Sequence, residues 1–151
     1  MSPDGLDRHP YQYVVLRAVP RVDREEFVNV GVVLYCEESR FLDAAWQVDE
    51  LRLTALDPGV DRAAVCRGLE FVAGVCRGDA ALGEIARKDL GVRFGFLKAP
   101  RSTVVQPGPV HGGLTADPPG ELERLLDRLV RRVGGGSHGY HAASRKRDSS
   151  Q

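Results

Sequence analysis

The feature that most constrains the fold is the segment Phe27–Cys36, F-V-N-V-G-V-V-L-Y-C, the longest apolar run in the chain. Its β-branched residues disfavour a helix, and it is too short to cross a membrane as one. Read as a strand, it places on one face Val28, Val30, Val32, Leu34 and Cys36. Gly31, in the middle, marks a bulge or a close approach by another backbone. We therefore expect a sheet built around this strand, with the uniformly apolar face as its core.

Two further segments alternate in the manner of strands, one on each side of the central run. Tyr11–Ala18 separates Val14, Leu16 and Ala18 from its tyrosines and arginine, and Phe41–Val48 alternates in the same way. The links between the three segments are short, so an antiparallel meander is expected. Ser102–Gln106 is predicted to form a fourth, short strand. Pro107–Gly113 is predicted to be a loop, because its prolines and glycines disfavour regular structure.

Two helices are predicted from their caps and apolar stripes. The first has Asp61 as its N-cap, runs to about Cys76 and ends at Gly78. The second begins at Asp117-Pro118 and carries the apolar stripe Leu122, Leu125, Leu126, Leu129, Val130 and Val133. Residues 80–97 give only a weak helical signal. The order β-β-β-α-(α)-β-α predicts an α+β fold, an antiparallel sheet of about four strands with helices packed on one face.

The 151 residues suffice for a single domain. We expect a flexible lead-in over 1–10, one α+β domain over 11–133 and a disordered, glycine-rich and polar tail over 134–151. No segment reaches the about 20 apolar residues of a membrane span, and the lead-in lacks the apolar core of a signal peptide. The cysteines Cys36, Cys66 and Cys76 lack metal-ligand spacing. A cytoplasmic protein with no membrane contact is therefore expected.

Charge and motifs narrow the function classes. The chain carries 21 basic and 21 acidic residues, which makes nucleic acid an unfavourable partner unless arginines form a stripe on the last helix. The glycine-rich nucleotide loops, the helical zinc motif and the nucleophile elbow are all missing from the sequence. We therefore predict no metal and no cofactor.

The first candidate site is the segment Arg101–Gly113, where a permanent cation, hydroxyl groups, flexible glycines and a titratable imidazole follow one another. Its candidate ligand-binding residues are Arg101, Ser102, Thr103, Gln106 and His111. Such a set suits an anionic ligand, a phosphate or a carboxylate. The competing interpretation is a purely structural connection, with Arg101 paired to a helix and His111 bonded to a carbonyl.

The second candidate is the mixed face of the predicted sheet, opposite the valines. It carries Tyr13, Arg17, Asn29, Gly31, Tyr35, Asp43 and Gln47. Aromatic and polar groups around a glycine suit a protein interface or a bound ligand. The competing interpretation is a surface pair between Arg17 and Asp43 with scattered tyrosines. If the Arg101–Gly113 segment folds over this face, the two candidates become one site.

Four motifs point to a family: Y-Q-Y-V-V-L-R-A-V-P, E-F-V-N-V-G-V-V-L-Y, L-D-P and A-P-R-S-T-V-V-Q-P-G-P-V-H-G-G-L. With them the chain resembles a bacterial family of unknown function, DUF3037. The resemblance implies no activity, but it implies a HipA-like kinase as partner, in a toxin–antitoxin-like pair. We therefore expect an accessory binding protein. The alternative is a small metal-independent enzyme for a phosphorylated or nucleotide substrate, with Arg101 binding the anion and His111 as general acid or base.

Overall fold

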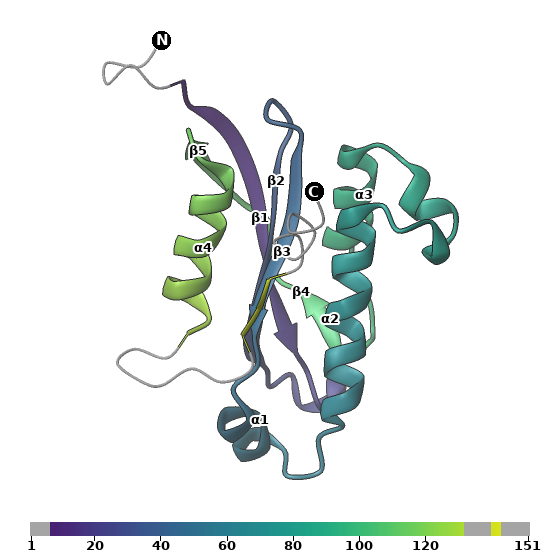
Figure 1. Ribbon diagram of the computed structural model, residues 1–151. Coiled ribbons are helices and arrows are strands. Elements are labelled where there is room, and N and C mark those ends of the chain that lie inside the picture. The colour runs from purple at the N-terminus through teal and green to yellow at the C-terminus, as the bar shows by residue number, and fades with distance from the viewer. Residues whose placement is uncertain (1–6, 132–139, 143–151) are drawn as a thin grey trace.

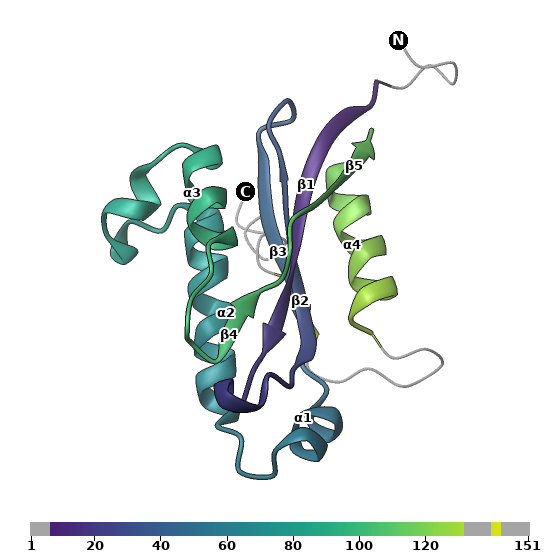
Figure 2. The ribbon, with the colours of Figure 1, turned by 180° about the vertical axis from the view of Figure 1, so that it is seen from behind.

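The computed structural model describes residues 7–131 and 140–142, and its centre is one antiparallel sheet (Figure 1). The strands are β1 (His9–Ala18), β2 (Val28–Cys36), β3 (Phe41–Gln47), β4 (Val105–Pro107), β5 (His111–Thr115) and β6 (Tyr140–Ala142). Their order is β4-β1-β2-β3-β6, and β5 also pairs with β1. Figure 2 shows β4 and β5 lying one after the other along the outer edge of β1. The predicted meander of three strands is therefore the middle of the sheet.

Four α-helices surround the sheet in the described part of the chain: α1 (Glu50–Leu56), α2 (Arg62–Arg77), α3 (Leu90–Lys98) and α4 (Pro118–Leu129). Three 3-10 turns lie at Val22–Arg24, Ala80–Leu82 and Glu84–Arg87. The predicted caps of α2 and α4 form, since Asp61 accepts from the Ala64 N–H and Asp117 from the Gly120 N–H. Gly78 ends α2 with φ 74°. Helix α1, capped by Asp49, is an addition to the predicted elements.

The α+β class is confirmed, but the expectation that the helices pack on one face is wrong. Helices α2 and α3 cover one face, where Leu69, Phe94 and Leu97 join the larger buried cluster. Helix α4 covers the other face, where Leu122, Leu125 and Leu126 join a second cluster. Figure 1 shows the sheet between these two helical layers. Each face of β2 and β3 is therefore a core face, so the sheet is buried on both sides at its centre.

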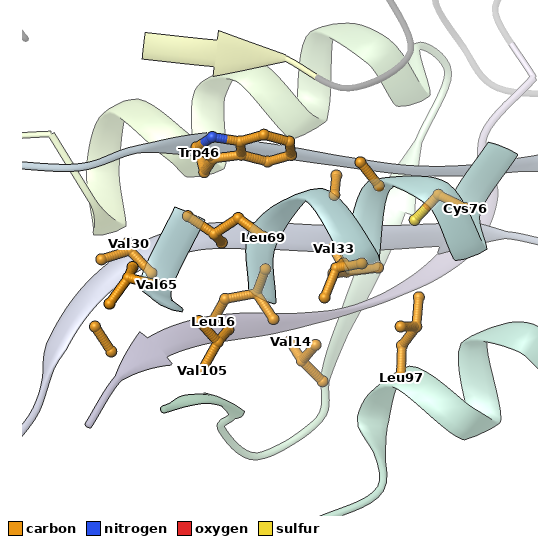
Figure 3. Packing of buried hydrophobic residues seen from close by; sticks show 14 of the residues in the cluster. Val14, Leu16, Val30, Val33, Trp46, Val65, Leu69, Cys76, Leu97 and Val105 are labelled. Carbon is orange, nitrogen blue, oxygen red and sulfur yellow. The ribbon is translucent and has the colours of Figure 1, made fainter. Parts of the chain in front are cut away.

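A β-bulge in β2 explains why the predicted valine face is wrong. Leu16 pairs with Gly31 but Arg17 pairs with Asn29, so Val30 is an extra residue in β2. The alternation therefore reverses at this point. Val28 and Val30 pack beneath α2 and α3, as Figure 3 shows for Val30, whereas Val32, Leu34 and Cys36 face α4. Val33 then takes the place under α2 that the simple alternation gave to Val32.

Gly31 has both roles that its position in the strand indicates. It stands next to the bulge, and a Cβ there would lie 2.9 Å from the Ala45 carbonyl oxygen and 2.9 Å from the Trp46 Cβ. Real Cβ atoms do not tolerate such distances, so only glycine allows β3 to approach this closely.

The segment after α3 contains two strands where the sequence predicted one strand and a loop. The predicted strand Ser102–Gln106 is shifted to Val105–Pro107, and His111–Gly113 belongs to β5 instead of a loop. The glycines are tolerated because β5 is an edge strand with its residues largely exposed. The described part of the sheet thus has six strands instead of about four.

The predicted chain ends are described only in part. His9 and Pro10, placed in the flexible lead-in, belong to β1, and the backbone of Tyr140–Ala142 in the predicted tail pairs with β3 as β6. The rest of the predicted tail lies outside the described residues. No helix in the described chain combines the length and the apolar character needed to span a membrane.

Candidate functional site

The candidate site is the part of the α4-side sheet surface that α4 does not cover. Helix α4 packs mainly on β2 and β3, which leaves the same surface of β1 and its edge partners open. We call it the Arg17 face. It consists of Tyr13, Val15, Arg17, Phe27, Gln106 and His111. Strand pairing assembles it, because Arg17 stands opposite Gln106 of β4, and Tyr13 stands opposite His111 of β5.

Arg17 is the most unusual residue of this face. Its guanidinium carbon lies 4.1 Å from the centre of the Phe27 ring, a cation–π contact. Its Nε is buried without a hydrogen-bond partner, and within the described chain the Arg17 side chain forms neither a hydrogen bond nor an ion pair. Buried donors are nearly always satisfied in folded proteins. An unpaired, partly desolvated cation is therefore held here by the fold.

The backbone around Arg17 is shaped to hold it. The β2 bulge lies directly opposite, between the partners of Leu16 and Arg17, and bulges commonly re-aim side chains next to sites. On the other side, the Gly108 N–H donates to the Val15 carbonyl at 2.8 Å. A Cβ on Gly108 would lie 3.1 Å from the Arg17 Nε and Cζ atoms. Glycine at this position therefore lets the β4–β5 connection close over the guanidinium.

An aromatic group occupies the other end of the Arg17 face. The rings of Tyr13 and His111 lie 5.3 Å apart at 30°, and the Tyr11 ring follows at 6.1 Å from that of Tyr13. The Tyr11 hydroxyl donates to Glu121 of α4 at 2.9 Å. Burial, together with the adjacent Glu121 carboxylate, raises the pKa of Tyr11 to about 12. This hydrogen bond ties α4 to β1 where the helical cover ends.

The structure brings together members of both sequence-predicted sets. Tyr13 and Arg17 from the sheet set stand opposite His111 and Gln106 from the segment set. Asn29 is next to Arg17 in β2, with its Nδ2 donating to the Leu129 carbonyl at 3.1 Å. These residues of the two sets therefore lie together because β4 and β5 pair with β1, and not because a loop folds over the sheet.

The remaining residues of the segment set lie elsewhere. Arg101 donates to the Phe96 carbonyl near the end of α3 and stacks on the Phe96 ring at 4.6 Å, and burial lowers its pKa. The Thr103 hydroxyl donates to the Val105 carbonyl at 2.8 Å, and Ser102 is exposed. Arg101 therefore lies on the α3 side and His111 on the α4 side of the sheet. A single cleft holding both, which the enzyme alternative needs, is not formed.

The remaining residues of the sheet set are also placed differently. Tyr35 lies on the α3 side, with its ring stacked on Phe94 at 5.3 Å, because the bulge reverses the alternation of β2. Gly31, Asp43 and Gln47 are buried. The predicted surface pair between Arg17 and Asp43 is not formed, since Arg17 has no ion pair within the described residues.

Sequence reasoning missed Phe27 as a site residue. Phe27 is 44% exposed although it is the first residue of the longest apolar run in the chain. The Arg17 guanidinium stacks on its ring. No local pattern connects Phe27 with Arg17, because their contact depends on the bulged register of β1 and β2. The only sequence signal was the charged run Asp23–Glu26, which indicates that Phe27 follows a turn.

The chemistry of the Arg17 face is that of binding. A fixed guanidinium offers donors to a carboxylate or a phosphate, and the aromatic rings offer apolar contact area. The described residues contain no group of three or more histidine, cysteine, aspartate or glutamate side chains placed to hold a metal ion.

Comparison with known proteins gives one match. No curated protein and no solved structure matches the chain significantly. Residues 13–130 match the family described as "Protein of unknown function (DUF3037)", and this range contains β1 from Tyr13 onward and every helix named above. The chain belongs to the DUF3037 family.

Proposed function

We propose that this protein works by binding, and that the Arg17 face docks onto an acidic patch of a partner protein. The observation that carries the proposal is the Arg17 guanidinium, fixed over Phe27 and unpaired within the described chain. A flexible surface arginine loses side-chain freedom and hydration when it binds a carboxylate. In Arg17 the fold has already removed part of the side-chain freedom and part of the hydration. A partner carboxylate therefore binds Arg17 with a more favourable free energy than it binds an exposed arginine.

The composition around Arg17 supports a protein as the partner. Arginine, tyrosine and phenylalanine are enriched at the centres of protein interfaces. Phe27 is 44% exposed, and Val110, in the turn between β4 and β5, is 41% exposed. Apolar side chains beside a fixed cation suit a patch in which a carboxylate is surrounded by apolar groups.

A HipA-like kinase is the partner that the family resemblance suggests, and the expected cytoplasmic location belongs to the same proposal. The test is co-expression of this chain with the HipA-like kinase of the same genome, followed by co-purification and measurement of the Kd. We expect a complex that Arg17→Glu weakens by about a hundredfold or more, because a like charge then faces the acidic patch.

The matched control is Arg67→Glu, which reverses a 71% exposed arginine on α2, on the opposite side of the sheet from the Arg17 face. It should leave the Kd within about threefold of wild type. Two free proteins at micromolar concentration would exclude this kinase as the partner. A complex that Arg17→Glu leaves intact would instead place the interface elsewhere on the surface.

A further inference from the structure

A second feature, at the N-terminal end of β1 away from Arg17, is a fork between two strands. The β1–β2 ladder ends at the pair Gln12–Tyr35, whereas the β1–β5 ladder continues to His9–Thr115. Strand β2 continues with β3 as far as Cys36–Phe41. Beyond Gln12, β1 therefore separates from the β2–β3 hairpin, and Figure 1 shows it curving away from that hairpin. The backbone of Pro10 and Tyr11 has no pairing residue in β2.

The fork contains a cavity of about 390 Å³, within the range of small-molecule sites. Its lining residues are Pro10, Tyr11, Gln12, Tyr35, Glu37 and Glu38. None of these side chains is basic, and the two glutamates are exposed at its edge. The wall is therefore aromatic and amide in character, and its charge is negative.

Tyr35 is held in a fixed position within this wall. Its ring stacks on Phe94 of α3 at 5.3 Å, and its hydroxyl donates to Glu37 at 3.3 Å. A Cβ on Gly91 would lie 3.0 Å from the Tyr35 hydroxyl oxygen, so the first turn of α3 closes against it. A rigid aromatic ring next to carboxylates is the arrangement with which proteins recognise ammonium groups.

We propose that the fork cavity binds a small organic cation carrying a primary ammonium group. The ammonium hydrogens are shared between Glu37 and Glu38, and the methylene chain lies along Tyr35 and Pro10. Two sources have this chemistry, a free aliphatic diamine and the lysine side chain of a peptide. The inference is independent of the Arg17 face, because neither Arg17 nor Phe27 lines the cavity.

The test is a titration of the isotope-labelled full chain, followed by the amide signals of Gln12, Tyr35 and Glu37. The probes are putrescine for the free diamine and Nα-acetyl-lysine methylamide for the lysine side chain. We expect saturable shifts with at least one probe, with a Kd of about 1 mM or tighter. The probe that binds more tightly identifies the source, and uncharged 1,4-butanediol should cause no saturable shift.

Variants separate this site from general charge attraction. The double change Glu37→Gln and Glu38→Gln keeps the shape of both side chains and should weaken binding by about tenfold or more. Glu70→Gln removes a carboxylate from the exposed surface of α2 and should leave the Kd unchanged. No saturable shift with either probe at about 10 mM, or equal weakening in the control and the double variant, would overturn the proposal.

Discussion

The two faces of the sheet are built differently. The α2 and α3 side buries twenty residues in one cluster, all apolar apart from the thiol of Cys76 and the indole N–H of Trp46. The α4 side buries nine, and α4 is also tied to the sheet by polar contacts, from Tyr11 to Glu121, from Asn29 to the Leu129 carbonyl and from Arg131 to Gln47. At the β1 edge the α4 side stays open around Arg17. One face thus supplies most of the burial, and the other leaves surface free for binding.

The difference follows from how much apolar area each side removes from water. Burying one large aliphatic side chain stabilises a fold by about 1.5–3 kcal/mol. On the α2 side, the helices α1, α2 and α3 contribute such side chains, whereas on the α4 side a single helix of 12 residues does so. The larger face therefore contributes most of the burial that offsets the cost of the unsatisfied Arg17 donor.

The largest expected effect tests whether both faces are core. Val32 and Val33 are each fully buried, Val32 against α4 and Val33 against α2. Val32→Asp and Val33→Asp should both prevent folding, since an unpaired buried charge costs several kcal/mol of a total stability of about 5–15 kcal/mol. Soluble yield and circular dichroism check this. If one variant folds normally, its side of the sheet is not closed.

The next effect compares the two helical layers directly. Leu69 of α2 and Leu125 of α4 are both fully buried, so truncation to alanine removes equal apolar groups. Such changes lower the free energy of unfolding by about 2–5 kcal/mol, and the loss is smaller where the surroundings can move into the space. We expect Leu69→Ala to be the more costly, because α4 packs alone and can shift. Urea unfolding of both variants measures the difference, and a larger loss for Leu125→Ala would reverse the comparison.

A smaller effect tests the polar attachment of α4. In the folded chain the pKa of Tyr11 is raised from 10.0 to about 12, so the neutral hydroxyl is favoured by folding. This contribution is complete below pH 10 and is lost as the pH rises through 12. Tyr11→Phe should reduce stability at neutral pH by about 1 kcal/mol. Above pH 10 the unfolding curves of wild type and variant should converge. A constant gap would mean that the Tyr11 hydroxyl is not bonded to Glu121.

The sequence predicts the elements better than the faces they present. The caps Asp61 and Asp117 follow from local chemistry, because each depends on a few neighbouring residues, and the class follows from the order of the elements. The bulge at Val30 does not, since it is set by the register between β1 and β2. Because of this one extra residue, Val32 faces α4 and Tyr35 faces α3, each on the side of the sheet opposite to the predicted one. The predicted interface, which needed Tyr35 beside Tyr13, is therefore not formed as a whole.

The candidate site divides in the same way. Arg17, Tyr13, Gln106 and His111 were identifiable as residue types suited to binding, and strand pairing brings them together. Arg101 was equally suited by type, but its guanidinium donates to the carbonyl of Phe96 near the end of α3. Sequence alone does not decide between a ligand and a local carbonyl, because both satisfy the same guanidinium.

The most direct test of the account is the stability of Arg17→Met. Removing a buried, unsatisfied donor should recover about 1–3 kcal/mol, whereas losing the cation–π contact with Phe27 forfeits about 0.5–1 kcal/mol. Methionine also keeps an apolar chain and a sulfur against the Phe27 ring. Arg67→Met, on the exposed surface of α2, is the control and should stay within about 0.5 kcal/mol of wild type.

The measurement is the free energy of unfolding in urea, with partner binding followed in parallel. If the Arg17 face exists to bind, Arg17→Met should be as stable as wild type or more stable, by about 1 kcal/mol, and should bind its partner more weakly. A loss of about 2 kcal/mol or more would show that Arg17 holds the fold together, and would contradict the account.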